Sequence, residues 1–439
     1  MDSPIVKMLK EYSERDILRL HMPGHKGTLD KHDITEVPGA DSLFDPMGVI
    51  KASEENAGTI FGADSFYSTE GSSLPIRAMI YLTTLYAKSL GKEPLILAAR
   101  NCHKSFISAL ALTGTTVKWM IPQNGASYLS CPLSAEEVEK EIEKSKPTAV
   151  YLTSPDYLGG MSDVEGISRV CRRLGVLLLV DNAHGAYLKF LNRSRHPMDL
   201  GADMCCDSAH KTLRVLGGGA YLHIAKNAPK VFKEHAKEAM SLFASTSPSY
   251  LILESLDRVN SELCDDYPRV LSSFVDKISA FNKKIALLGY TNISSEPLKI
   301  TIDTRGFGYC GDELAKLLSE SGVVCEFYDR DYLVMMLSPY MTDEELERLY
   351  SALKAIPKRE IIKKQLHSYS LPRVDITPRE ATLSLSERLK VEECIGRTLA
   401  SVTVGCPPAV PIIVSGEVID EDTVKVAKYY GIEEFSVVV

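Results

Sequence analysis

The stretch Val176-Leu177-Leu178-Leu179-Val180-Asp181 decides the fold of this chain, together with Asp207-Ser208-Ala209-His210-Lys211-Thr212. The apolar run that ends at Asp181 has the length and composition of a buried parallel strand. Lys211 follows a second short segment of this kind, residues 203–207. Because open α/β sheets bind ligands at the carboxyl ends of their strands, we predict that Asp181 and Lys211 lie on adjacent strand ends and face one crevice.

An acid and a lysine in this arrangement are what the chemistry of pyridoxal phosphate (PLP) requires. The lysine forms a Schiff base with the PLP aldehyde, and the acid keeps the pyridine nitrogen protonated so that the ring accepts electrons. Taken singly, each residue also has a simpler explanation. Lys211 is equally consistent with a solvated surface lysine, and Asp181 with a helix N-cap.

Two further segments favour the PLP interpretation. His103 follows the apolar run 94–98 at a predicted strand-to-helix junction, where an imidazole can lie flat on an aromatic ring. Gly71, Ser72 and Ser73 precede a predicted helix and offer backbone N–H groups, two hydroxyls and the positive end of the helix dipole to a phosphate. Alone, this triplet predicts no more than an N-cap. The four features in this order are far more specific than any one of them.

In this order the motifs resemble the ornithine/lysine/arginine decarboxylases among the fold type I PLP enzymes. The resemblance covers nearly the whole chain and is carried by six phrases: His21-Met22-Pro23-Gly24-His25-Lys26-Gly27, Arg100-Asn101-Cys102-His103-Lys104-Ser105, Val180-Asp181-Asn182-Ala183-His184-Gly185-Ala186, Ser208-Ala209-His210-Lys211-Thr212-Leu213, Thr246-Ser247-Pro248-Ser249-Tyr250 and Pro407-Pro408-Ala409-Val410-Pro411. It implies an α/β fold, namely a large PLP-binding domain of the fold type I transferase type with a mostly parallel central sheet. A smaller α/β domain and a short C-terminal domain would follow.

The resemblance also implies roles for individual residues. Lys211 would hold PLP, Asp181 would pair with the pyridine nitrogen, and His103 and the methyl of Ala183 would cover the two ring faces. The phosphate candidates of the same subunit are Ser72, Ser73, Ser208 and His210, whereas Thr246 and Ser247 would reach the phosphate of the partner in a homodimer. Two acids in the loop 38–46, Asp41 and Asp45, would recognise the distal cation of the substrate. The predicted catalytic residues are Lys211, Asp181, His103 and His210.

Simpler alternatives stay open for several of these residues. His210 is also consistent with a buried core imidazole, and Ser247 with the N-cap of the helix that begins at residues 249–251. Asp41 and Asp45 are also consistent with solvated turn residues.

The chain departs from the family pattern at several positions. Glu70 stands where family members usually carry Asn before the phosphate-loop glycine, which places an acid near a dianionic phosphate. Asn182 replaces an acid that often follows the pyridine-binding Asp, and Arg214 replaces a common proline. Gly217 and Ser42 also differ from the residues common there. These changes touch phosphate and substrate contacts, whereas Asp181 and Lys211 are retained.

The composition excludes several classes of protein. A net charge of −8 argues against nucleic acid as a partner. No apolar run reaches the roughly 18 residues that span a bilayer, and the first residues lack the features of a signal peptide. The ten cysteines show no paired metal-binding spacing, which predicts reduced thiols, no metal site and a cytoplasmic location.

The order of predicted elements indicates four parts. Residues 1–30 form an N-terminal helix and arm, 31–260 the large PLP-binding domain, 261–360 the small α/β domain and 361–439 the C-terminal domain. We expect strands at 95–98, 116–120, 149–152, 176–180, 204–206 and 219–223, long helices across 249–288 and a helix near 385–393. In the small domain we expect strands at 298–302, 323–328 and 332–337. The early phosphate loop predicts a short family member without an N-terminal flavodoxin-like domain.

The predicted activity is the PLP-dependent decarboxylation of a basic amino acid to its amine and CO₂, a step of the kind that serves polyamine biosynthesis. Arginine is favoured over lysine or ornithine because short members resemble biosynthetic arginine decarboxylases. One alternative is another fold type I activity, either an aminotransferase or a lyase. A second is a PLP-binding paralogue without catalytic activity, an idea motivated by Glu70, Asn182 and Arg214.

Overall fold

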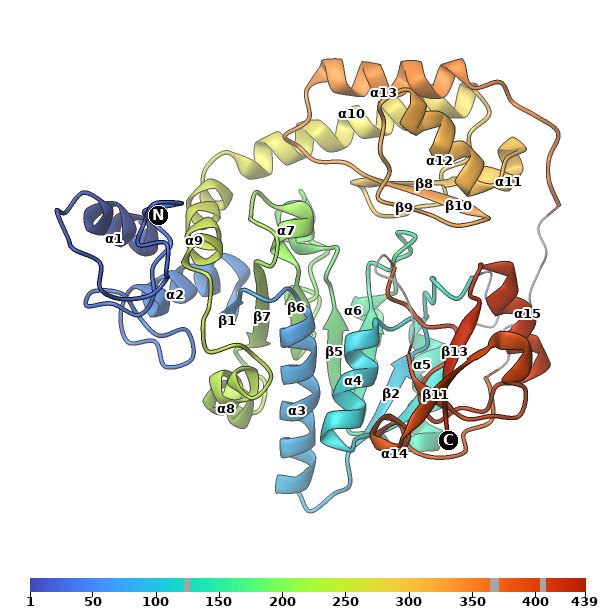
Figure 1. Cartoon of the computed structure of the whole chain (residues 1–439), viewed down its shortest axis with the longest axis horizontal. Helices are drawn as coiled ribbons and strands as arrows, with labels where there is room; N and C mark the ends of the chain where they lie inside the picture. Colours follow the sequence, from blue (N-terminus) through green and yellow to red (C-terminus); the bar gives the residue numbers. More distant parts are fainter. Residues whose placement is uncertain (122–126, 364–370, 403–407) are drawn as a thin grey trace. The chain divides into compact units, whose positions relative to one another are not determined.

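The structure is a computed structural model that describes residues 1–121, 127–363, 371–402 and 408–439 (Figure 1). Pro407 of the predicted proline motif lies outside these residues. The chain divides into two compact units, each treated by itself below. The first comprises Met1–Leu97, Ser134–Leu152 and Asp163–Arg269, and the second comprises Ala98–Leu133, Thr153–Ser162 and Val270–Val439. This division does not test the four predicted domain ranges, which stay predictions.

The main sheet has the strand order β1-β7-β6-β5-β4-β2-β3. Strands β5 and β6 pair in parallel, whereas β7 is antiparallel to both of its neighbours, β1 and β6. A mostly parallel central sheet was expected, and it is confirmed. The strands are β1 Ala63–Ser68, β2 Leu95–Ala99, β3 Thr116–Met120, β4 Ala149–Thr153, β5 Leu177–Asp181, β6 Met204–Asp207 and β7 Ala220–Ala225.

Helices join these strands in the first unit. Strand β5 is buried along its whole length, which explains why its sequence is continuously apolar rather than alternating. The short helix α7 follows β6 at its carboxyl end and carries Lys211 (Figure 1). The helices are α1 Pro4–Ser13, α2 Val49–Phe61, α3 Ser73–Ser89, α5 Ala135–Ser145, α6 Val164–Leu174, the 3₁₀ helix η1 Ala186–Phe190, α7 Ala209–Thr212, α8 Lys230–Ser241 and α9 Tyr250–Cys264.

The second unit contains two further three-stranded sheets, with the orders β8-β10-β9 and β11-β13-β12. All pairs within these sheets are antiparallel. The helix α10 Tyr267–Leu287 leads into this unit. The other elements are α4 Lys104–Thr113, β8 Lys299–Asp303, α11 Thr304–Phe307, α12 Gly311–Glu320, β9 Phe327–Tyr328, β10 Tyr332–Met336, α13 Asp343–Ala355, α14 Pro378–Leu383, β11 Ser386–Lys390, η2 Val391–Glu393, β12 Leu399–Ser401, α15 Glu421–Tyr429 and β13 Glu434–Val438.

Three sequence-based expectations differ from the structure. The helix predicted near 385–393 is wrong, because residues Ser386–Lys390 form β11 and pair with β13. The strand predicted at 323–328 is reduced to Phe327–Tyr328. Strand β1, with the sequence Ala-Asp-Ser-Phe-Tyr-Ser, was not predicted because it has few β-branched residues. The six strands expected in the main sheet are present, with end shifts of at most two residues.

None of the helices in the described ranges combines the length and the apolar composition that crossing a membrane requires.

Candidate active site

Asp181 is the last residue of β5, and its side chain lies in the interior of the first unit with 2% of its surface exposed. Its Oδ1 accepts the Ala183 N–H at 3.2 Å and the Cys206 thiol at 3.5 Å, and its Oδ2 accepts the Tyr151 hydroxyl at 3.3 Å. The bonds from Ala183 and Tyr151 are long for a carboxylate acceptor. Burial raises the pKa of Asp181, and the positive charge of Lys211 only partly offsets this rise. Such a carboxylate is electrostatically suited to a cationic partner.

Lys211 lies on the short helix α7, which begins directly after β6. Its Nζ is 3.1 Å from Nε2 of His184, which follows β5 in the same motif as Asp181. The His184 side chain is buried. The predicted placement of Asp181 and Lys211 at the ends of neighbouring strands therefore agrees with the structure. The direct contact between His184 and Lys211 was not predicted from the sequence.

The predicted phosphate loop brings together two segments far apart in the sequence. Ser208 donates its hydroxyl to Oγ of Ser72 at 2.8 Å, and Ser72 is the N-cap of the 17-residue helix α3. The Gly71 N–H donates to the Gly218 carbonyl at 2.7 Å, which fixes the loop against the turn before β7. Gly218 has φ of 99°, and a Cβ atom there would lie 2.7 Å from the Thr69 carbonyl oxygen, so this close approach requires glycine.

His210 lies beside this loop. Its Nδ1 donates to the Gly219 carbonyl at 2.9 Å, and a Cβ built on Gly71 would lie 3.9 Å from its Cε1. Burial lowers the pKa of His210, so the neutral ring with the proton on Nδ1 is favoured. The structure thus brings Ser72, Ser208 and His210 to the start of α3, next to Ser73, while their contact with a phosphate stays a prediction.

Glu70 forms a hydrogen bond with a residue outside the predicted phosphate loop. Its Oε1 accepts the Ser245 N–H at 2.7 Å, which connects the loop to the segment that carries Thr246 and Ser247. Both Thr246 and Ser247 are exposed, and Ser249 rather than Ser247 caps α9 by accepting the Ile252 N–H. The alternative in which Ser247 is the helix N-cap is therefore wrong, and its predicted role across a dimer stays open.

His103 belongs to the second unit, where it is the N-cap of α4. Its Nδ1 accepts the Ser105 N–H at 3.1 Å, which leaves the proton of the neutral ring on Nε2. Ala183, in the first unit, is buried directly after Asp181 and Asn182. The stacking of His103 and Ala183 on opposite ring faces stays a prediction.

Asp41 is buried and serves as an anchor for backbone groups. Its two carboxylate oxygens accept five N–H groups, from Ser42, Met47, Gly48, Ile50 and Lys51, at distances from 2.8 to 3.4 Å. Burial raises the pKa of Asp41, but the backbone N–H donors outweigh this and lower it. Asp45 is exposed. The structure gives Asp41 a role in holding the start of α2, and substrate recognition by either acid stays a prediction.

Asp207 is a buried carboxylate that the sequence did not single out. The Asn182 amide donates to its Oδ1 at 2.6 Å, and Nε2 of His196 and of His223 approach its Oδ2 at 2.9 and 3.3 Å. Nδ1 of His196 accepts the Met198 N–H, so its Nε2 is the protonated nitrogen. Burial raises the pKa of Asp207, but the two histidines reverse this and hold it well below its usual range. His196 lies in a loop, and no local sequence pattern indicates its role. For Asp207 there was a signal, because an acid within the apolar run 203–207 is unusual.

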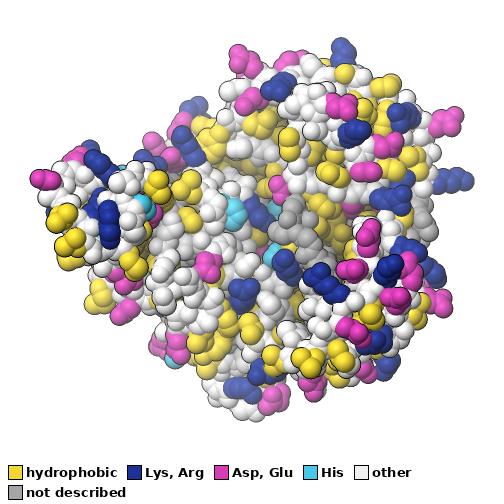
Figure 2. Space-filling view, viewed as in Figure 1, with side chains coloured by type: hydrophobic (Ala, Val, Ile, Leu, Met, Phe, Trp, Pro, Cys, Tyr) yellow, Lys and Arg dark blue, Asp and Glu magenta, His cyan; other side chains and the backbone are white. Residues whose placement is uncertain are grey.

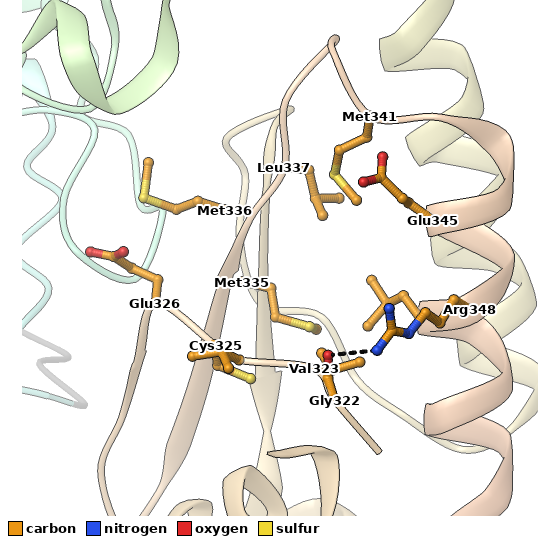
Figure 3. A pocket seen from close by; sticks show the side chains of 12 residues that line it. Gly322, Val323, Cys325, Glu326, Met335, Met336, Leu337, Met341, Glu345 and Arg348 are labelled. Atoms are coloured by element: carbon orange, nitrogen blue, oxygen red, sulfur yellow. Dashed lines mark hydrogen bonds between the residues drawn. The ribbon is translucent and has the colours of Figure 1, made fainter. Parts of the chain in front are cut away.

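A separate cavity of about 470 Å³ lies in the second unit between β10 and α13 (Figure 3). Apolar side chains line it together with the charged Glu326, Glu345 and Arg348, and the guanidinium of Arg348 donates to the Gly322 carbonyl. None of the predicted site residues lines it. The lining residues that Figure 3 labels are Gly322, Val323, Cys325, Glu326, Met335, Met336, Leu337, Met341, Glu345 and Arg348.

The family models place most of the chain in one family. Residues 3–295 match the model of the Orn/Lys/Arg decarboxylase major domain, and residues 360–436 match the model of the C-terminal domain of the same family. An arginine decarboxylase of Bacillus anthracis is 26% identical, with 97% of this chain and 92% of the relative covered. A protein of Bacillus subtilis named YaaO, which has no assigned function, is 28% identical over a similar share of both chains.

Solved structures agree on the fold. The lysine decarboxylase LdcF of Francisella novicida superposes with a TM-score of 0.80 at 20% identity and covers all of this chain, with 81% of its own length. Lysine decarboxylase A of Pseudomonas aeruginosa gives the same TM-score over 97% of this chain and 75% of its own. With both family models matched in order along the sequence, the chain belongs to the Orn/Lys/Arg decarboxylase family and is a fold type I, PLP-dependent amino-acid decarboxylase.

Proposed function

We propose that this enzyme decarboxylates L-arginine in preference to lysine and ornithine. The observation that carries the substrate is the match, over at least 94% of this chain, to several curated arginine decarboxylases at 25–27% identity. A lysine decarboxylase of Pseudomonas aeruginosa matches at 25% identity over only 58% of the chain. A net charge of −8 also favours the approach of a cationic amino acid.

The residues of the first unit fit PLP. Asp181 is a buried carboxylate with long contacts and a raised pKa, which suits a protonated pyridine nitrogen. Lys211 lies close enough for its charge to act on Asp181, and hydroxyls from two segments meet at the N-terminus of a long helix. The N-terminus of a long helix is a site for a phosphate. We assign the pyridine to Asp181, the aldehyde to Lys211 and the phosphate to Ser72, Ser73, Ser208 and His210.

PLP, when bound, supplies the aldehyde that takes up the substrate amine and the conjugated ring that accepts the electrons released with CO₂. Asp181 would keep the proton on the pyridine nitrogen, because burial raises the pKa of its carboxylate and so favours a cationic partner. His184 Nε2 accepts from the Lys211 ammonium and helps to hold Nζ in place. The Lys211–His184 pair is our candidate donor of the proton that replaces the carboxyl group on the substrate, ahead of His210, whose Nδ1 proton is held by the Gly219 carbonyl.

We also propose that the active unit is a homodimer in which Thr246 and Ser247 reach the phosphate of the partner. Both residues are exposed, as this role requires. The N-terminal segment offers a surface for a second copy, because the side chains of Leu18, Leu20 and Leu29 are 82%, 83% and 84% exposed. Figure 2 shows hydrophobic side chains gathered on the left, over the N-terminal part of the chain. A cytoplasmic location and a role in polyamine biosynthesis stay part of this proposal.

Release of CO₂ from a panel of L- and D-arginine, lysine and ornithine tests the substrate assignment. We expect kcat/KM to be highest for L-arginine. A higher value for lysine or ornithine would overturn the arginine preference and leave the reaction class intact. Conversion of the cofactor to pyridoxamine phosphate without CO₂ would indicate an aminotransferase. Bound PLP without turnover of any of the six amino acids would indicate a non-catalytic paralogue.

A further inference from the structure

We propose that the C-terminal part of the chain positions the cofactor-stacking histidine, with Arg100 and Glu417 as the positioning residues. This inference rests on the stacking role of His103 that the family resemblance implies and on the proposed function. Arg100 lies three residues before His103, and Glu417 lies in the region 360–436 that matches the C-terminal family domain. All residues of this argument belong to the second unit.

The first contact is a fully buried ion pair. Nη2 of Arg100 is 2.8 Å from Oε2 of Glu417, and the two side chains are 2% and 1% exposed. The same Nη2 donates to the Ile412 carbonyl at 3.2 Å, while Oε2 of Glu417 also accepts the Val414 N–H at 2.8 Å. Separating the two side chains would leave an uncompensated buried charge. The pair therefore holds Arg100 and Glu417 in one arrangement.

The second contact lies on the other side of His103. The Lys104 N–H donates to the Ala409 carbonyl at 2.8 Å, so the segment 409–417 holds the turn both before and after the histidine. Ala409 has φ of 56°, a conformation that non-glycine residues rarely adopt and that persists where the surrounding contacts impose it. Within α4, the Ser105 N–H then sets the ring by donating to Nδ1 of His103.

These contacts give the C-terminal region a supporting role for the turn that carries His103. His103 as N-cap fixes its own ring relative to α4, and the turn before α4 receives additional support from the C-terminal region. The segment 409–417 gives this support through one ion pair and two bonds to backbone carbonyls. We therefore expect cofactor affinity to depend on Glu417, although Glu417 itself does not touch the cofactor.

The only tryptophan of the chain provides a direct readout of the ion pair. The guanidinium carbon of Arg100 lies 4.9 Å from the centre of the Trp119 ring. A change in the position of Arg100 changes the surroundings of this indole, so Trp119 emission reports on the pair in the protein without PLP. This signal is independent of turnover.

The test is a double-mutant cycle on the full chain with Glu417→Gln and His103→Ala, in which the dissociation constant of PLP is measured by titration. We expect Glu417→Gln to weaken PLP binding about tenfold, the size seen when supporting hydrogen bonds behind a ligand are lost. It should also shift Trp119 emission. In the His103→Ala background the same substitution should have almost no further effect on PLP affinity. Glu387→Gln is the matched control, because Glu387 forms an exposed pair with Arg397 at 2.9 Å in the same domain.

Two outcomes overturn the proposal. One is an unchanged PLP affinity in Glu417→Gln despite altered Trp119 emission, and the other is an equal loss of affinity in the presence and absence of His103. If His103→Ala alone leaves PLP affinity unchanged, the stacking role of His103 fails instead. Arg100→Lys keeps the charge but loses the planar guanidinium, so it serves as the second variant if Glu417→Gln does not fold, with the same expected results.

Discussion

Two buried carboxylates, Asp181 and Asp207, end neighbouring strands of the same sheet, yet the protein treats them in opposite ways. Asp207 has three donors at 2.6 to 3.3 Å, and its pKa is held well below the usual range by His196 and His223 despite burial. Asp181 accepts long bonds from an amide and a phenol and a weak bond from a thiol, and burial raises its pKa. The difference separates a carboxylate that is satisfied by the protein from one that we assign to a cationic ligand.

The largest effect is expected for Lys211→Ala, which tests whether this strand edge binds the cofactor at all. We expect no measurable turnover, because no other amine on α7 can take its place. Borohydride reduction of the wild-type protein should attach PLP to Lys211, as shown by peptide mapping. A label on Lys26 or Lys104 would contradict the assignment.

Asp181→Asn tests the ligand-directed side of the comparison. We expect kcat/KM to fall ~100-fold, equivalent to about 2.7 kcal/mol, because the pyridine proton loses its acceptor. Without PLP the variant should be at least as stable as wild type at pH 7, since a carboxylate with a raised pKa destabilises the fold above its unfolded pKa. Thermal unfolding of the PLP-free protein checks this. Activity within threefold of wild type would show that another residue pairs with the pyridine.

Asp207→Asn tests the carboxylate that is satisfied by the protein. The substitution removes the negative charge beside His196 and His223 and one of the two accepting oxygens, and we expect a loss of about 3–5 kcal/mol of stability in the PLP-free protein. Because the pKa of Asp207 is lowered, its stabilisation is present above the unfolded value near 3.8 and is lost as the pH falls further. Acid unfolding curves of the variant should therefore be flatter below that pH. Equal stability of the two proteins at pH 7 would contradict the comparison.

The smallest effect is expected for Asp41→Asn. This substitution tests whether Asp41, a third buried acid, is satisfied by the protein like Asp207 or binds a cationic ligand as we assign to Asp181. Five backbone donors and a lowered pKa resemble Asp207, so we expect a loss of about 1–3 kcal/mol of stability with KM for arginine unchanged. Asp45→Asn, at an exposed position of the same loop, is the control. A raised KM with normal stability would instead assign Asp41 to the substrate cation, as the family resemblance implies.

The sequence allowed the strand ends of the main sheet to be predicted because their apolar runs are local signals. Asp181, Lys211, Ser72 and Ser208 follow from such runs and from motif order. The network of Asp207 was not predicted, because His196 and His223 reach it from a loop and from β7, and no sequence spacing encodes that meeting. The partner of Glu70 was missed for the same reason, since Ser245 lies 175 residues away.

The C-terminal region shows a second limit of prediction from sequence, in which the type of an element was predicted wrongly. Ser386–Lys390 was expected to be helical because the segment is mostly polar and charged, with Leu389 as its apolar contact to the core. Its strand conformation comes from backbone pairing with Glu434–Val438, some 48 residues later, rather than from its own side chains. Pairing of this kind overrides local preference, as is common for edge strands.

The bond between Asn182 and Asp207 has a consequence for the evolution of this chain. The family resemblance leads us to expect an acid at the position of Asn182, but in this chain an acid there would meet a second carboxylate at the 2.6 Å spacing of the present bond. Two like charges at that distance in a dry interior are strongly unfavourable. A lineage that moves between the two arrangements must therefore first neutralise one position, so each residue restricts which substitutions selection can accept at the other.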